Sequence, residues 1–304
     1  MRTRTMMIWI VSLLTFGGLY WWLVQESHMP DNAAYEFNID KVRQLANSLP
    51  GDKPTQLRYE HVASFEFARA MVMAGDAWNG VEIPVYAFEV VYADRIGIID
   101  TAMNREIAKP EFMVPFFDDK AYQRVIDALD HAAFIAVTHE HLDHIGGLLA
   151  SPHLSALKPV LQLTGTQLAH PENMDPAKIP PGALDGYQPL NYVGLHALSP
   201  GVVLIAAPGH TPGSQMVYVK LASGAEVLLL GDVSWQQQNI ALLRERPRFM
   251  TAIIGENRTQ VLGEFQALHA LALREPAVHQ VPGHDGAVVA ALTSSGVLQA
   301  GFIP

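Results

Sequence analysis

The chain has 304 residues, of which 49% are hydrophobic and 16% charged, so it is long and apolar enough for one large domain or two small ones. It carries 20 basic and 30 acidic side chains, and its formal net charge of −10 comes without any basic stripe. We therefore expect no nucleic-acid partner, because phosphate-backbone binding relies on Lys and Arg. The absence of cysteine excludes disulfides and thiolate metal ligands.

The N-terminal segment predicts a membrane-spanning helix. Residues 6–24 are uncharged and, as a helix, would be about 28 Å long, close to the hydrocarbon thickness of a bilayer. The aromatic run Tyr20–Trp22 stands at one end, where such side chains favour the membrane interface. Arg2 and Arg4 precede the segment and place the N-terminus in the cytoplasm by the positive-inside rule.

Two other interpretations of this segment remain open: a cleaved signal peptide and a buried helix. The bulky aromatic end and the lack of a small-x-small cleavage site favour a retained anchor. The anchor puts the rest of the chain outside the cytoplasm, in the periplasm of a Gram-negative cell, whereas signal cleavage gives a secreted protein. We predict an anchor or signal at 1–24, a linker at 25–54 with one short helix at 40–49, and a domain at 55–304.

The first part of this domain reads as strands followed by a helix and a further strand. Alternating or apolar runs predict strands at 65–69, 85–92, 96–100 and 134–138, and apolar residues at helical spacing predict a helix at 119–131. This order, with polar residues at the C-terminal end of the last strand, is typical of layered α/β sheets.

Those polar residues are three histidines and one aspartate within six positions. His139 and His141 point to the same side of a strand end, and a turn into a helix brings Asp143 and His144 over the same point. Without a metal, this cluster would crowd groups that need hydrogen-bond partners into an apolar region. The pattern therefore predicts a metal site with nitrogen and oxygen donors.

Three later strand ends also carry metal-binding residue types. Strands predicted at 202–207, 226–230 and 281–282 run into His210, Asp232 and His284, and strands are also predicted at 160–163 and 215–221, with a helix at 259–275. Residues 170–200 are rich in Pro and Gly and predict a long loop, where we expect substrate contacts.

The run His139-x-His141-x-Asp143-His144 resembles the motif of the metallo-β-lactamase-fold hydrolases, and the resemblance covers residues from about 80 to 286. Pro208–Ser214, Gly231-Asp232 and Gly283–Asp285 look like the later motifs of that family, and most like those of N-acyl-homoserine-lactone lactonases. The resemblance implies an α/β fold, a four-layered αββα sandwich of two mixed sheets, here preceded by the transmembrane helix.

The resemblance also implies a binuclear metal centre. His139, His141 and His210 would hold one divalent ion, Asp143, His144 and His284 the other, and Asp232 would bridge them, with zinc as the default metal. Asp143 and Asp232 are the residues expected to take part in catalysis, in which a metal-bridging hydroxide attacks a carbonyl. For Asp100 the sequence leaves two roles open, support of a ligand or a plain turn residue. The remaining histidines are expected on the surface or in the core.

The small-molecule substrate suggested by the resemblance is a lactone or ester, with acyl-homoserine-lactone-like compounds favoured. One residue departs from the family pattern: Trp235 stands where well-known members have a Tyr that assists the reaction, and an indole is not a useful acid near neutral pH. A small-molecule phosphodiesterase of the same fold and a non-catalytic membrane-tethered binding domain remain the alternatives.

Overall fold

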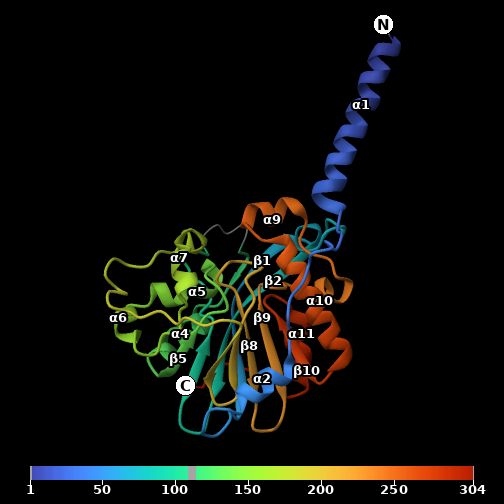
Figure 1. Cartoon of the computed structure of the whole chain (residues 1–304). Coiled ribbons are helices and arrows are strands. Elements are labelled where there is room, and N and C mark those ends of the chain that lie inside the picture. Colours follow the sequence, from blue (N-terminus) through green and yellow to red (C-terminus); the bar gives the residue numbers. More distant parts are fainter. Residues whose placement is uncertain (1, 109–113, 304) are drawn as a thin grey trace.

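The computed structural model describes residues 2–108 and 114–303. Met1, where the predicted anchor begins, and Pro304, where the predicted domain ends, lie outside the described residues. Helix α1 (Arg2–Tyr20) continues into a π-helical turn, η1 (Trp21–Gln25), and stands away from a body built on two sheets (Figure 1). A window at Arg4–Gln25 is long and apolar enough to cross a membrane, and 6% of it is buried.

Both sheets contain parallel and antiparallel pairs. The first has the order β11-β1-β2-β3-β5 with β4 beside β1, and its strands are β1 (Gln56–Ala68), β2 (Gly80–Val91), β3 (Ile96–Ile99), β4 (Phe116–Phe117), β5 (Ala132–Ala136) and β11 (Gln299–Ala300). The second has the order β10-β9-β8-β7-β6, with β6 (Leu195–Ser199), β7 (Val202–Ala206), β8 (Gln215–Lys220), β9 (Glu226–Gly231) and β10 (Val278–Pro282).

The remaining helices are α2 (Ile39–Ala46), α3 (Arg69–Val72), α4 (Asp119–Leu129), α5 (Leu142–Ala150), α6 (Leu154–Leu157), α7 (Gly165–Ala169), η2 (Pro171–Met174), α8 (Gln237–Leu242), α9 (Arg248–Ile254), α10 (Arg258–Arg274) and α11 (Gly286–Ser294). Helices α4 and α5 cover the outer face of the first sheet, α2 and α10 cover that of the second, and the other helices lie in the connecting segments. Helix α4 shows why they form: the Asp118 carboxylate caps its first turn, and Ala121, Val125 and Leu129 lie on one buried face.

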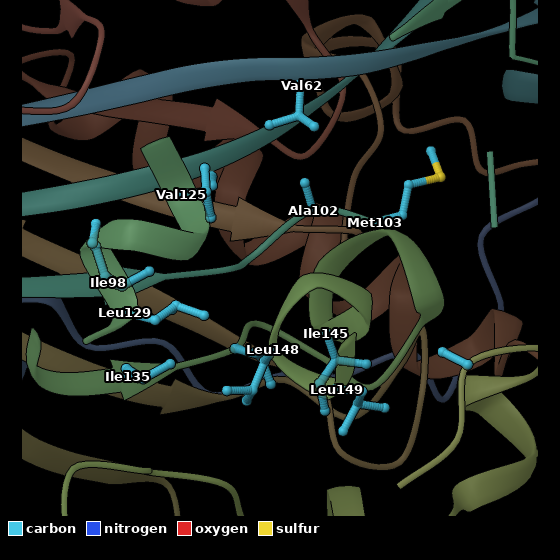
Figure 2. Close-up of a cluster of buried hydrophobic side chains, with 14 of the residues drawn as sticks. Val62, Ile98, Ala102, Met103, Val125, Leu129, Ile135, Ile145, Leu148 and Leu149 are labelled. Atoms are coloured by element: carbon cyan, nitrogen blue, oxygen red, sulfur yellow. The ribbon is translucent and has the colours of Figure 1, made fainter. Parts of the chain in front are cut away.

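Three apolar cores separate four layers. In the first, Val125 and Leu129 of α4 and Ile145 of α5 pack against Ile98 and Ile135 of the first sheet (Figure 2). The second core lies between the sheets, and the third lies between the second sheet and helices α2 and α10.

Strand β7 shows how one sequence serves two of these cores. Val202 and Leu204 point into the core between the sheets, while Val203 and Ile205 point toward α10, because side chains alternate along a strand. A strand buried on both faces reads as a continuous apolar run, as this one does. The predicted αββα sandwich of two mixed sheets is confirmed.

Two predicted elements, at 160–163 and 170–200, differ in the structure, and a third, the segment at 25–54, holds its predicted short helix packed against the body. Residues 160–163 do not form a ladder; among the described residues, Leu161 makes an isolated bridge to Ile135 before Thr164 caps helix α7. The predicted loop at 170–200 contains η2 and strand β6, which adds an edge to the second sheet. The predicted linker at 25–54 contains α2, whose Val42 and Ala46 are buried against that same sheet.

Candidate metal centre

Four strand ends meet at one edge of the sandwich. Strands β9 and β10 are parallel, and β7 runs the same way because both β7 and β9 are antiparallel to β8, so their C-terminal ends share one edge of the second sheet. Strand β5 of the first sheet delivers its C-terminal end to the same place. The structure brings all seven residues predicted from the sequence into two adjoining groups.

The first group consists of His139, His141, His210 and Asp232, whose ligand atoms all lie within 4.8 Å of one another. Nδ1 of His141 lies 3.0 Å from Nε2 of His139 and 3.0 Å from Nε2 of His210. Oδ2 of Asp232 lies 3.4 Å from Nε2 of His210. Three ring nitrogens and one carboxylate oxygen therefore point at a common centre.

The second group consists of Asp143, His144 and His284, also within 4.8 Å. Oδ1 of Asp232 lies 3.2 Å from Nε2 of His144 and 3.0 Å from Nε2 of His284. Asp232 thus directs one carboxylate oxygen toward each group, which is the arrangement that a bridging ligand needs.

The donor set fits a pair of divalent cations. Among the described residues, Nε2 of His144 and Oδ1 of Asp232 are buried without a hydrogen-bond partner. Burial lowers the pKa of His139 and His210 well below the ordinary histidine value, so both rings present lone pairs. His141 Nδ1 can carry at most one proton for the two ring nitrogens that face it, so the buried lone pairs that remain are costly unless a cation satisfies them.

The pKa values in the second group move the other way. Burial opposes protonation of His144, but the charges of Asp100, Asp143 and Asp232 outweigh it and raise its pKa well above the usual value. The pKa of Asp232 falls well below its usual range despite burial, because His284 and His144 stabilise its charge. The site therefore holds concentrated negative charge that favours a positive partner.

Asp100 orients this second group from behind. Its Oδ2 accepts a hydrogen bond from Nδ1 of His144 at 2.9 Å, and its Oδ1 accepts one from the backbone N–H of Thr138 at 2.6 Å. A carboxylate on Nδ1 fixes the tautomer that leaves Nε2 free to bind a metal. Of the two roles left open for Asp100, the contacts support that of a ligand-orienting residue.

Trp235 makes a direct contact with the shared carboxylate. Its indole N–H donates to Oδ2 of Asp232 at 2.7 Å, and its ring lies face to edge with His284 at 5.9 Å between centroids. Gly283 allows this close packing, because a Cβ there would lie 2.4 Å from Oδ1 of Asp232.

A buried ion pair, not predicted from the sequence, supports the same corner. Arg246 and Glu256 pair with no exposed side-chain surface on either residue. Arg246 also donates to the backbone carbonyl of Asp232 at 3.2 Å, and its guanidinium lies 4.9 Å above the Trp235 ring. No local motif marks these two residues; the only signal available in the sequence was a pair of opposite charges ten positions apart.

Like Glu256, Glu140 is a buried carboxylate that the sequence analysis did not predict, although it stands within the central motif. It accepts hydrogen bonds from Thr211 Oγ1 at 2.9 Å and Asn173 Nδ2 at 3.0 Å. Asn173 belongs to the predicted substrate loop, so that segment is tied to the motif through Glu140. Farther along the same predicted loop, Asn191–Val193 line a cavity of about 420 Å³ together with Pro212 and Ser214. None of the seven clustered residues lies on the described wall of that cavity.

Comparisons with known proteins agree with this geometry. The family described as the metallo-beta-lactamase superfamily matches residues 84–284. The N-acyl homoserine lactonase AiiA of Bacillus thuringiensis subsp. kurstaki is 32% identical over 114 residues, which are 36% of this chain and 42% of that protein. The match thus spans less than half of that relative's length.

Two solved structures share the fold. One is an N-acyl homoserine lactone hydrolase with the product N-hexanoyl-L-homoserine bound at its catalytic metal center; the TM-score is 0.60 at 19% identity, over 77% of this chain and 94% of that one. The other is AidC, a dizinc quorum-quenching lactonase, with a TM-score of 0.50 at 14% identity, over 77% of this chain and 90% of that one.

Proposed function

The chain belongs to the metallo-beta-lactamase superfamily, and from this premise we propose that it is a binuclear metal-dependent hydrolase of lactones or esters, with acyl-homoserine-lactone-like substrates favoured. The observation that carries the proposal is the convergence of seven donor residues, five of them buried and two half-buried, in two groups that share Asp232. A lactonase relative at 32% identity supports the substrate class.

We assign His139, His141 and His210 to one cation, Asp143, His144 and His284 to the other, and Asp232 to both, with zinc as the proposed metal. Imidazole and carboxylate donors suit zinc. Divalent ions held by these residues would supply Lewis acidity, which lowers the pKa of water and polarises a carbonyl oxygen.

The chain's own residues handle the proton. The attacking water adds to the carbonyl carbon, the C–O bond of the lactone or ester breaks, and the proton from water ends on the leaving oxygen. Asp143 keeps 13% of its side chain exposed, so we assign it the transfer of this proton. Asp232, which directs one oxygen toward each group of ligands, keeps the two groups aligned. Trp235 cannot act as the acid, since its N–H is bonded to Asp232.

We further propose that α1 is a retained membrane anchor, with residues 25–54 linking it to a catalytic domain at 55–304 outside the cytoplasm. Contacts within the apolar segment support retention rather than cleavage. The Val24 carbonyl accepts a hydrogen bond from the backbone N–H of Gly75 at 3.0 Å, and the Arg248 guanidinium lies 5.3 Å above the Trp22 ring.

Metal analysis of the purified chain and a substrate panel test the proposal. We expect close to two divalent ions per chain and turnover of acyl-homoserine lactones ahead of aryl esters, β-lactams and bis-p-nitrophenyl phosphate. His139→Ala and Asp232→Ala are expected to abolish turnover. A metal-replete protein that binds no ions would favour a non-catalytic domain, and preference for the phosphate diester would favour a phosphodiesterase.

A further inference from the structure

We propose that the outer face of α9 and the aromatic residues at the base of α1 rest in the headgroup layer of the bilayer. The metal centre then lies one helix away from the membrane and takes from it lactones or esters with long acyl chains. This inference rests on the proposed anchor and hydrolase function. We call the surface formed by Tyr20, Trp21, Trp78 and Ile253 the collar.

The anchor is fixed to the body rather than loosely tethered. Val24 is buried, and its carbonyl accepts a hydrogen bond from the backbone N–H of Gly75 at 3.0 Å. The Arg248 guanidinium of α9 lies 5.3 Å above the ring of Trp22 and pairs with Glu26. Because the turn that follows α1 is held by several contacts, the face of the body that meets the membrane is determined.

That face is apolar and aromatic. Ile253 is 73% exposed and Trp78 is 55% exposed, and the Trp78 indole donates to the Tyr20 hydroxyl at 2.9 Å. Arg248 is the only charged residue of α9, and Glu26 neutralises it. Tyr and Trp favour the membrane interface, where an apolar ring and a polar group are both accommodated.

The position of α9 explains why a bilayer, rather than another protein, covers this face. Figure 1 shows α9 at the end of the body from which α1 departs, while α2 lies at the opposite end. Helix α9 packs directly against η1, so the collar continues the surface of a candidate span with its own interfacial aromatic residues. A bilayer that surrounds the end of α1 therefore reaches the collar without any movement of the body.

The inner face of α9 leads to the metal centre. Met250 packs in a buried cluster with Trp235, and Phe249 and Ile254 of the same helix pack against that cluster while half-buried. Trp235 in turn bonds Asp232. An acyl chain that passes α9 would thus meet apolar side chains while its carbonyl end reaches the metal-binding residues.

Site-directed labelling tests the docking surface directly, because the chain has no native cysteine. The full chain is reconstituted in phosphatidylcholine vesicles and recovered by flotation. Single-cysteine variants Ile253→Cys and Leu273→Cys then receive a nitroxide label. Leu273 is a matched control, since it is also 73% exposed but stands two residues before Glu275, which pairs with Arg43 of α2 at the opposite end.

We expect the label at position 253 to be shielded from a water-soluble nickel chelate and accessible to oxygen, and the label at position 273 to be exposed to the chelate. Equal exposure of both labels in floated protein overturns the docking surface while leaving the anchor and the hydrolase intact. A chain that fails to float overturns the anchor and the docking surface together. Protection at position 253 that also appears without vesicles indicates a second copy of the chain and overturns the bilayer.

A kinetic measurement tests the consequence for substrate. In vesicles, Ile253→Asp is expected to lower the ratio of rates on N-decanoyl and N-butanoyl homoserine lactone by about tenfold, equivalent to about 1.4 kcal/mol. Leu273→Asp should leave that ratio unchanged. An unchanged ratio in Ile253→Asp overturns delivery from the membrane, whereas no turnover of either lactone by the wild-type chain rejects lactone substrates without bearing on the nitroxide result.

Discussion

The indole N–H of Trp235 donates a hydrogen bond to Oδ2 of Asp232 at 2.7 Å, and this carboxylate is the one shared by both groups of candidate ligands. Trp235 is buried and also packs against Met250 of α9. Trp235, which the sequence analysis singled out as a departure from the family pattern, therefore contacts a candidate metal ligand directly. Its role is positioning.

Trp235→Phe is therefore expected to lower metal affinity by about 10- to 100-fold, because loss of a residue that orients a ligand typically has that effect. Phe keeps most of the apolar packing against Met250. Competition with a chromogenic chelator measures the affinity, and Trp235→Tyr, which restores a donor, is the control. Equal affinity in the wild type and both variants would show that the hydrogen bond to Asp232 has no role.

Asp100→Asn separates charge from backbone conformation. Asp100 has a φ of 60°, in the left-handed region that Asn also tolerates, so the turn is expected to persist. The substitution removes the carboxylate that holds Nδ1 of His144, and we expect metal affinity to fall by about 10- to 100-fold. Thermal unfolding in the presence of chelator serves as the control for the fold. Unchanged affinity in a folded variant would make Asp100 a turn residue only.

Arg246→Met leaves Glu256 as a buried carboxyl group without its partner. Removing one member of a buried pair typically lowers the free energy of unfolding by about 3–5 kcal/mol. The double substitution Arg246→Met with Glu256→Leu is expected to recover most of that loss, because it leaves no isolated charge. Urea denaturation measures both variants. If the double variant is as unstable as the single one, Arg246 acts through Asp232 and Trp235 rather than through Glu256.

The pH dependence of stability includes a contribution from Glu264. Burial raises the pKa of this carboxyl group to about 8 from a usual 4.5, with a smaller contribution from Glu256, and its Oε1 accepts a hydrogen bond from the Gly209 N–H at 3.0 Å. Between these two values the folded chain keeps a proton that the unfolded chain has released. The stabilisation is complete below the lower value and is lost as pH rises through the higher one.

We expect this residue to lower the free energy of unfolding by about 1.4 kcal/mol for each pH unit within that window. Glu264→Gln keeps the acceptor for Gly209 and cannot titrate, so the difference between the variant and the wild type isolates the contribution. Urea denaturation across the window gives the slope. Parallel curves for the two proteins would show that Glu264 is ionised in the folded state.

The sequence predicted the layered fold because its strands are buried on both faces. Continuous apolar runs such as Val202–Ala206 admit few other interpretations, and polar residues directly after such runs point to one edge of a sheet. The same logic predicted a metal site after residues 134–138, and the resemblance to the metallo-β-lactamase-fold hydrolases added His210, Asp232 and His284 to it.

Short elements and long-range pairs were beyond this reasoning. Helix α9 is a short, largely apolar segment with no polar face that periodicity could detect, and its orientation depends on contacts with Trp22 and Trp235. Strand β6 is half-buried at a sheet edge, so its residues alternate poorly. The Arg246–Glu256 pair depends on how the chain turns back on either side of helix α9, which local patterns do not encode.

The four strand ends that meet at the candidate metal centre belong to different sheets and are far apart in the chain, from His139 after β5 to His284 after β10. Ions bound there would act as a cross-link between the two halves of the sandwich and close a long loop of chain. Chelation should therefore lower the resistance of the whole molecule to heat, proteases and mechanical force. The bound metal would contribute to stability as well as to catalysis.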